Sequence, residues 1–158
     1  MAGRDRDLLR ASLPMPDRVS ARAHLLAGAL QAEPEPAVFA DLQSRIVAYF
    51  EGKEVDFSDV PVYLEGQGEF ACKVLEACRK VGLGQTVTYG DLARTIGRPT
   101  AARAVGGALG RNPIPLIIPC HRVIGMHGGL CGFSAPGGIA YKDRLLRHER
   151  STRHSSHN

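Results

Sequence analysis

The run Pro119-Cys120-His121-Arg122 holds the side chains of this 158-residue chain that are best suited to covalent chemistry. A cysteine attacks as the thiolate, so a reactive cysteine needs a nearby base or positive potential that lowers the pKa of its thiol. His121 and Arg122 stand directly beside Cys120 and could supply either. A buried structural cysteine is the alternative, and the Cys-His pair alone does not decide between the two.

The other three cysteines are Cys72, Cys78 and Cys131, and no two cysteines of the chain form a CxxC pair. Neither zinc-binding nor redox spacing is therefore present. Cys72 and Cys78 lie in the apolar-periodic stretch FACKVLEACRKV, where we expect small buried hydrophobes. We predict no metal site and no disulfide.

Composition and charge favour a soluble protein that binds a polyanion. Hydrophobic residues make up 44% of the chain, and no apolar run approaches the roughly 18 residues that span a bilayer. The start, MAGRDRDLLR, is no secretory signal, so we expect a cytoplasmic, nucleoid-associated protein without membrane contact. Residues 1–69 hold 7 Lys/Arg against 12 Asp/Glu, net −5, whereas residues 70–150 hold 12 against 4, net +8. The basic half is typical of phosphate binding, although a merely solvated basic face is the alternative.

Apolar periodicity predicts the helices that position these groups. One helix is expected from Phe39 to a stop at Gly52 and another over residues 70–81. Residues 1–36 show a weak helical pattern, and the first 40 residues show no strand alternation. The residues that carry these patterns are Val19, Ala23, Leu26 and Leu30; Phe39, Leu42, Ile46, Tyr49 and Phe50; and Phe70, Val74, Leu75, Cys78 and Val81.

Two short helices in the basic half form a helix-turn-helix candidate. Thr88 and Asp91 have the spacing of a capping box that opens a helix ending at Gly97. The second helix starts at Pro99-Thr100 and ends at Gly110. Its sequence, TAARAVGGALG, has such small side chains that its backbone could approach a narrow groove or, alternatively, another helix of the core.

The segment that follows the second helix delivers Cys120. Leu116-Ile117-Ile118, bounded by two prolines, predicts a buried extended segment that leads to the cysteine. A Gly-rich loop follows from Gly125 to Gly138, and then a last helix with Ile139, Leu145 and Leu146 inward. The polar tail from Ser151 is expected to be disordered.

Four ordered runs resemble the O-6-alkylguanine-DNA alkyltransferase family. They are TVTYGDLA at 86–93, AARAVGGALGRNPIPLIIPCHRV at 101–123, PCHRVIG at 119–125 and KDRLLRHE at 142–149. The resemblance spans residues 41–150 and implies an α+β, mostly α fold.

The implied organisation has four parts. Residues 70–150 would form a winged-helix-like, helix-turn-helix alkyltransferase domain, preceded by a helix and connecting segment at 41–69. Residues 1–40 would be an atypical, helical or partly disordered segment where the family usually has a sheet-rich domain, so either that domain is truncated with a helical substitute or the start of the sequence is wrong. Residues 151–158 would be the disordered tail.

The resemblance also implies a single-turnover DNA repair reaction. Cys120 would accept, irreversibly, a methyl or other alkyl group from O-6-alkylguanine in double-stranded DNA, with O-4-alkylthymine as a second candidate substrate. His121 would deprotonate Cys120 through a bridging water, and Glu149 would orient the imidazole. Tyr89 would donate to a ring nitrogen of the guanine, and Lys142 would polarise Tyr89. The protein would act as a monomer without metal, nucleotide or methyl donor.

A base stacked in a duplex cannot meet a buried thiol, so the resemblance further implies minor-groove binding and base flipping. Arg103 would fill the vacated place in the stack, and Ala102 and Gly106 would allow close approach. Asn112 would tie the helix-turn-helix to the active-site segment, with a simple Asn-Pro turn as its local alternative. We also expect Arg122 among the DNA-binding residues.

The implied base pocket is where this sequence departs from the family. Tyr89, Pro115, Phe133 and Ser134 are expected to line it. Many members have tyrosine near Phe133, which cannot donate a hydroxyl, and the extra Ala135-Pro136 changes the loop length. Ser134 remains a candidate donor.

Two rival functions are considered. Non-catalytic alkyltransferase-like binders replace the cysteine, so Cys120 argues against that function. A small DNA-binding regulator would need base-reading side chains at the start of the second helix, and only Arg103 is there. Single residues have bland alternatives too: Glu149 as a surface charge, Lys142 as an exposed helical lysine, and Tyr89 as a half-buried aromatic.

Overall fold

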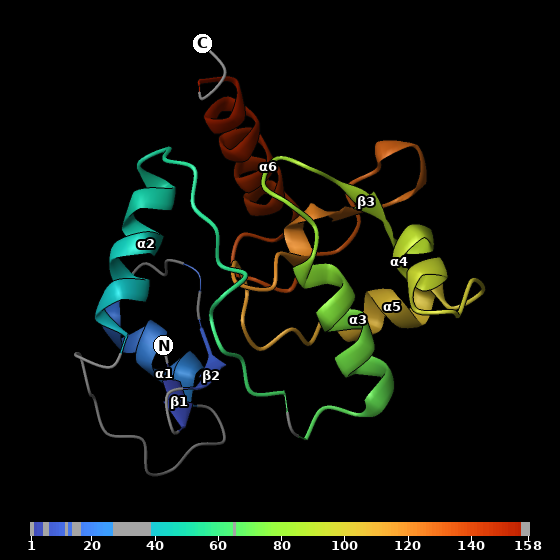
Figure 1. Cartoon of the computed structure of the whole chain (residues 1–158), viewed down its shortest axis with the longest axis horizontal. Coiled ribbons are helices and arrows are strands. Elements are labelled where there is room, and N and C mark those ends of the chain that lie inside the picture. Colours follow the sequence, from blue (N-terminus) through green and yellow to red (C-terminus); the bar gives the residue numbers. More distant parts are fainter. Residues whose placement is uncertain are drawn as a thin grey trace.

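The described part of the chain is mostly helical, as the sequence predicts. The computed structural model describes residues 2–4, 7–11, 13, 17–26, 39–64 and 66–155. The elements are β1 (Ala2–Arg4), β2 (Asp7–Arg10), α1 (Arg18–Leu26), α2 (Ala40–Phe50), α3 (Glu69–Arg79), β3 (Val87–Thr88), α4 (Tyr89–Thr95), α5 (Ala102–Leu109), a 3-10 turn (Cys120–Arg122), β4 (Val123–Ile124), a second 3-10 turn (Met126–Gly128) and α6 (Gly138–Ser155) (Figure 1). Within the described residues, every helix is too short or too polar to cross a membrane.

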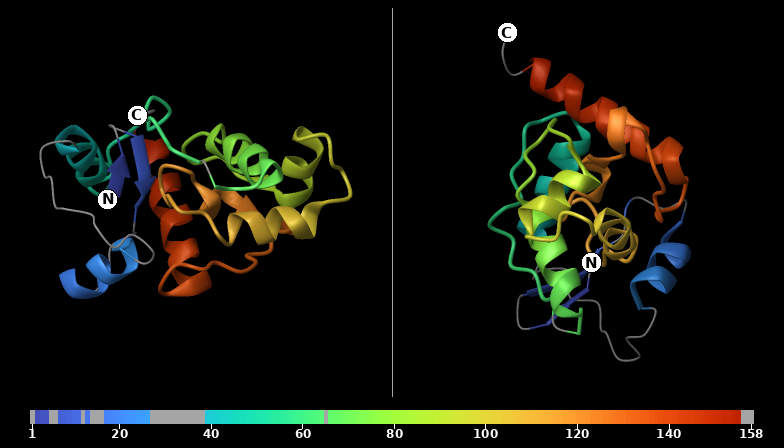
Figure 2. Two further views of the ribbon diagram at one scale, coloured as in Figure 1. Left: turned by 90° about the horizontal axis from the view of Figure 1, so that it is seen from below. Right: turned by 90° about the vertical axis from the view of Figure 1, so that its right-hand side faces the viewer.

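The N-terminal elements and the helix pair α4–α5 lie at opposite ends of the molecule. Figures 1 and 2 place α1, α2 and the hairpin at one end and α4 and α5 at the other, with α3 and α6 between them. One hydrophobic core joins these parts, with Leu42 of α2, Leu75 of α3 and Leu145 of α6 among its buried members. Residues on α2 can therefore contact groups held by α6.

The N-terminal segment contains strands that the sequence does not predict. Strands β1 and β2 pair antiparallel, with Gly3 opposite Leu8. At three and four residues they are too short to display a readable alternation. Beyond β2, Ala11 and Leu13 are buried, and the Ala11 amide donates to the Pro113 carbonyl at 3.1 Å. Helix α1 agrees with the weak helical pattern, whose last member, Leu30, lies outside the described residues.

The predicted helices at 39–52 and 70–81 are confirmed as α2 and α3. Gly52 follows α2 with φ +82°, a left-handed conformation that suits glycine and ends the helix. Helix α3 buries Val74, Leu75 and Cys78 on one face, as the periodicity predicts. Both helices are positioned by their apolar faces.

The helix pair α4 and α5 begins with the predicted capping box. The Thr88 hydroxyl accepts from the Asp91 amide at 3.0 Å, and the Asp91 carboxylate accepts from the Thr88 amide at 2.8 Å. Helix α4 is followed by Gly97 at φ +71°. Helix α5 starts at Ala102 rather than at Pro99-Thr100, which lie in the turn before it.

The apolar run before Cys120 is buried, but it is not an extended segment. Leu116 has φ +76°, and the Ile118 amide donates to the Ile114 carbonyl at 2.9 Å, so the chain turns back on itself. Asn112 holds this turn, because its amide nitrogen donates to the Ile118 carbonyl at 2.8 Å and its oxygen accepts from the Ile114 amide at 3.0 Å. This side-chain clamp replaces the expected strand.

The C-terminal helix is longer than the sequence predicts. Helix α6 continues through Ser155, so residues 151–155 are helical rather than disordered, and residues 156–158 lie outside the described part. Thr152 is buried on this last stretch and its hydroxyl donates to the His148 carbonyl at 3.0 Å. Leu145 and Leu146 are buried as predicted, whereas Ile139 is 48% exposed.

Candidate active site

Cys120 begins the 3-10 turn at the edge of the core and is 9% exposed. Its amide donates to the Ile118 carbonyl at 2.8 Å, which fixes the turn directly after the clamped segment. Burial raises the pKa of the Cys120 thiol, although a hydrogen bond with the Asn112 side chain and the charge of Lys142 oppose this shift. The thiol is therefore held protonated and needs a base before it can attack.

His121 and Glu149 form the buried pair that could supply this base. His121 Nε2 lies 2.8 Å from Glu149 Oε1, and the two side chains are 1% and 0% exposed. Burial lowers the pKa of His121, against the opposing effect of Glu149. A neutral imidazole that donates its Nε2 proton to a carboxylate keeps an acceptor lone pair on Nδ1. The surface-charge alternative for Glu149 is wrong.

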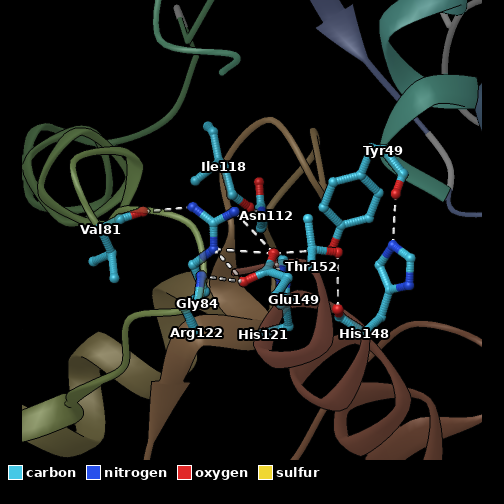
Figure 3. A network of polar contacts seen from close by, with 10 residues as sticks. All are labelled: Tyr49, Val81, Gly84, Asn112, Ile118, His121, Arg122, His148, Glu149 and Thr152. Carbon is cyan, nitrogen blue, oxygen red and sulfur yellow. Dashed lines mark hydrogen bonds and ion pairs between the residues drawn. The ribbon is translucent and has the colours of Figure 1, made fainter. Parts of the chain in front are cut away.

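Glu149 is the centre of a fully hydrogen-bonded network (Figure 3). Its two oxygens accept from Arg122 Nη2 at 2.8 Å and Nε at 2.9 Å, from the Gly84 amide at 3.0 Å and from the Tyr49 hydroxyl at 2.9 Å, besides His121. Burial alone would raise the pKa of Glu149, but the hydrogen bonds from His121 and Arg122 outweigh it and hold that pKa well below its usual range. The carboxylate is therefore a permanent, compensated charge.

Arg122 does not lie where the sequence predicts. It was expected to contact DNA, but its guanidinium is buried against Glu149, and Nη1 donates to the Val81 carbonyl at 2.5 Å. An arginine that neutralises a buried carboxylate is unavailable to a phosphate. Asn112, which was placed in the DNA-binding set as the tie to the active-site segment, binds the turn before Cys120 with both ends of its amide. Its predicted tie to the active-site segment agrees with this geometry.

Lys142 is fully buried, so its alternative as an exposed helical lysine is wrong. Its ammonium donates to the Val123 carbonyl at 2.6 Å and the Cys131 carbonyl at 3.2 Å, and lies 3.4 Å from the Tyr89 hydroxyl. Burial lowers the pKa of Lys142. Burial likewise raises the pKa of Tyr89, with smaller effects from the nearby thiols of Cys131 and Cys120, so Tyr89 remains a proton donor. Lys142 thus joins β4, the Gly-rich loop and α4 beside the thiol.

A hollow of about 740 Å³ opens between α4, α5 and the Gly-rich loop. The structure brings four predicted residues together in its wall: Tyr89, Ala102, Arg103 and Gly106. The full lining is Thr88, Tyr89, Gly90, Asp91, Arg94, Ala102, Arg103, Gly106, Met126, Cys131 and Gly132. This lining includes a charged side chain, the exposed Arg103, and an apolar one, Met126, which is 76% exposed.

The remaining predicted pocket residues do not line this hollow. Phe133 packs against the core, Pro115 is half-buried in the turn held by Asn112, and Ser134 is exposed. Their predicted contact with a substrate base stays a prediction.

Tyr49 is the functional candidate that sequence reasoning missed. It comes from α2, far from the other groups along the chain, and is 1% exposed. In the sequence it looks like any inward aromatic of an amphipathic helix. Only the packing of α2 against α6 identifies its hydroxyl as a partner of Glu149.

Comparison with known proteins gives a consistent result. The family model described as 6-O-methylguanine DNA methyltransferase, DNA binding domain, matches residues 69–151. A methylated-DNA–protein-cysteine methyltransferase of Mycobacterium bovis is 45% identical over 118 residues, covering 75% of this chain and 69% of the relative. The crystal structure of Mycobacterium tuberculosis OGT in complex with DNA superposes with a TM-score of 0.76 at 38% identity, covering 96% of this chain and 85% of that one. The O6-methylguanine-DNA methyltransferase of Pyrococcus kodakaraensis gives a TM-score of 0.61 at 30% identity, covering 84% and 80%.

Proposed function

This chain belongs to the 6-O-methylguanine DNA methyltransferase family, which makes it a DNA-binding repair enzyme that acts by alkyl transfer, and we propose that Cys120 is the acceptor. The observation that carries this assignment is the placement of a protonated, buried thiol beside a neutral histidine whose Nε2 is fixed by Glu149. The substrate that we propose is O-6-alkylguanine in double-stranded DNA. The retained cysteine argues against a non-catalytic damage binder.

The reaction is an in-line displacement in which the Cys120 thiolate and the His121 imidazolium form only when the substrate is bound. His121 takes the Cys120 proton at Nδ1 through a water, and Glu149 stabilises the imidazolium that forms. The sulfur then attacks the alkyl carbon, an S–C bond forms, and the C–O bond to guanine breaks with its electron pair leaving on the guanine. Tyr89 donates a proton to a ring nitrogen of the base, so that neutral guanine departs. A thioether has no easy route back, so each molecule acts once.

The hollow beside α5 is the proposed entrance for the flipped nucleotide. The bare surface of Ala102 and Gly106 permits close approach to the minor groove, and the exposed Arg103 supplies the side chain that occupies the vacated place in the stack. Lys142 holds Tyr89 and the loop of Cys131 against this entrance. We propose that the protein works as a monomer on nucleoid DNA in the cytoplasm.

The acceptor assignment is tested by intact mass measurement. After incubation with a duplex that carries one O-6-methylguanine, the protein should gain one methyl group, located at Cys120 by peptide mapping. Cys120→Ser should gain none, whereas Cys72→Ser, which removes a half-buried thiol outside the site, should react. Reaction of Cys120→Ser, or no reaction of the unmodified protein, contradicts the assignment.

Arg103→Ala should react normally with free O-6-alkylguanine and poorly with the duplex, because only the duplex requires flipping.

A further inference from the structure

We infer that Tyr49 is a positioning residue for this reaction, because its buried hydroxyl holds Glu149 and limits how strongly that carboxylate attracts the His121 proton. The inference rests on the proposed roles of Cys120, His121 and Glu149. It concerns a residue of α2, which precedes the segment 69–151 that matches the family model.

Tyr49 and His121 share a single carboxylate oxygen. The Tyr49 hydroxyl donates to Glu149 Oε1 at 2.9 Å, and the same oxygen lies 2.8 Å from His121 Nε2. Figure 3 shows Tyr49 reaching Glu149 from α2, on the side away from Arg122. Each donor that an oxygen accepts disperses part of its charge, so Tyr49 and His121 compete for the basicity of Oε1.

Helix α6 holds Tyr49 at its backbone carbonyl and at its hydroxyl. His148, the neighbour of Glu149, has Nε2 at 2.5 Å from the Tyr49 carbonyl, and its ring packs edge-on to the Tyr49 ring at 5.1 Å. Phe50 packs edge-on to the same ring, also at 5.1 Å. The backbone and the hydroxyl of Tyr49 are thus fixed to consecutive residues of α6, which sets the direction from which Glu149 is held.

Tyr49 acts as a donor at neutral pH. Burial and the negative charge of Glu149 raise the pKa of Tyr49 well above its usual range. Since ionised Glu149 can only accept, the hydroxyl proton lies between the two residues. A phenylalanine at this place would leave Oε1 with one donor fewer and a more concentrated charge.

The protonation of His121 depends on every charged group around it. Cys120 and Arg122 lie on its own turn, Glu149, Lys142 and His148 face the network from α6, Tyr49 faces it from α2, and Cys78 of α3 lies near the thiol. Among these, Glu149 raises the pKa of His121, whereas burial, Arg122 and Lys142 lower it. Removal of the Tyr49 hydroxyl therefore strengthens the one influence that favours the imidazolium, and His121 stays protonated to higher pH.

The decisive experiment compares Tyr49→Phe with the unmodified full-length protein. The imidazole of His121 is titrated by NMR in the DNA-free protein, with its signal identified by its absence in His121→Gln. We expect the pKa of His121 to rise by about one unit in Tyr49→Phe. The acid limb of the pH profile for methyl transfer should move to higher pH by the same amount. Phe50→Leu is the matched control, because it disturbs the same helix and ring packing while it leaves the donors of Glu149 in place.

Two outcomes would overturn the inference, and neither depends on whether the proposed function is correct. An unchanged pKa of His121 in Tyr49→Phe, with or without lower stability, overturns the inference, as does an equal shift in Phe50→Leu. The NMR titration needs no alkylated DNA, so it gives its answer even if Cys120 accepts no methyl group. Should Tyr49→Phe fail to fold, 3-fluorotyrosine introduced at position 49 provides a stronger donor, and the pKa of His121 should then fall.

Discussion

At the scale of single residues, the site pairs its buried permanent charges with each other beside reacting groups that are neutral. Glu149 and Arg122 neutralise each other within the core, while Cys120 and His121 are both held in their neutral forms by burial. A buried ion pair of this kind stabilises a protein weakly, but the loss of either partner is costly. We therefore regard Arg122 as a structural counter-charge for Glu149.

The neutral state of buried His121 predicts how stability depends on pH. The pKa of His121 is lowered in the folded protein, so below the ordinary value of about 6.5 the unfolded chain binds a proton that the folded chain does not. The free energy of unfolding should therefore fall as the pH drops from about 6.5 toward the lowered folded value, and Glu149, whose folded pKa is also lowered, should add a further loss below about 4.3. Urea unfolding at several pH values from about 7.5 to about 5, which bracket the ordinary histidine pKa, measures this slope. His121→Gln should show a flatter slope over this interval; an equal slope in both proteins would refute the assignment.

At the scale of elements, α5 carries the surface that we propose for close contact with DNA. Gly106 faces the hollow, and a Cβ built there would lie 3.7 Å from the Tyr89 ring, an ordinary contact. Gly107 is exposed, and a Cβ there would meet only the end of the Arg111 side chain at 3.8 Å. The two adjacent glycines thus have similar freedom to accept a methyl group, but only Gly106 is in the hollow's lining.

Alanine substitutions at Gly106 and Gly107 should therefore have the same effect on stability but different effects on DNA binding. Gly106→Ala and Gly107→Ala should each stabilise the protein by about 0.5–1 kcal/mol, because alanine is the better helix former. Only Gly106→Ala should weaken binding to duplex DNA, since its methyl group occupies the proposed contact surface. Thermal unfolding and fluorescence anisotropy with a labelled duplex measure the two effects. Equal DNA affinities of the two variants would count against this surface.

The elements also show what the sequence could and could not predict. Helices α2 and α3 and the capping box at Thr88 were predictable because periodicity and capping are local properties. The turn before Cys120 was not, because a side chain six residues away, Asn112, holds it.

The same distinction applies to the candidate site. The resemblance identified His121 and Glu149, whose contact the structure places at 2.8 Å. Arg122 is buried against Glu149 and Val81, which lie 27 and 41 residues away along the chain, and the Tyr49 hydroxyl meets Glu149 across 100 residues. No local pattern carries that information.

At the scale of the whole molecule, the N-terminal segment is part of the core rather than an appendage. Leu13 is 5% exposed and belongs to the same hydrophobic cluster as Cys120, and the neighbouring Ala11 is bonded to Pro113. The segment thereby supports the turn that presents the thiol.

Truncation of Leu13 tests this connection. Leu13→Ala should lower the free energy of unfolding by about 2–5 kcal/mol, the usual cost of a leucine-to-alanine change in a core. Val47→Ala, at a side chain that is 57% exposed, should change it by less than about 0.5 kcal/mol. Denaturant unfolding of both variants provides the comparison, and a neutral Leu13→Ala would mean that the segment is dispensable for the core.

Helix α6 places two polar groups of the site within the hydrophobic core. It carries Lys142 and Glu149 two turns apart on the buried face that also holds Leu145 and Leu146. Backbone amides on such a face exchange with solvent deuterium only when the surrounding core opens, whereas the loop around the exposed Met126 can open locally at little cost. The groups that α6 contributes to the site are therefore expected to lose their order only when the core opens. On heating, the amides of Lys142 and Glu149 should become open to exchange together with global unfolding, and those of the loop around Met126 before it.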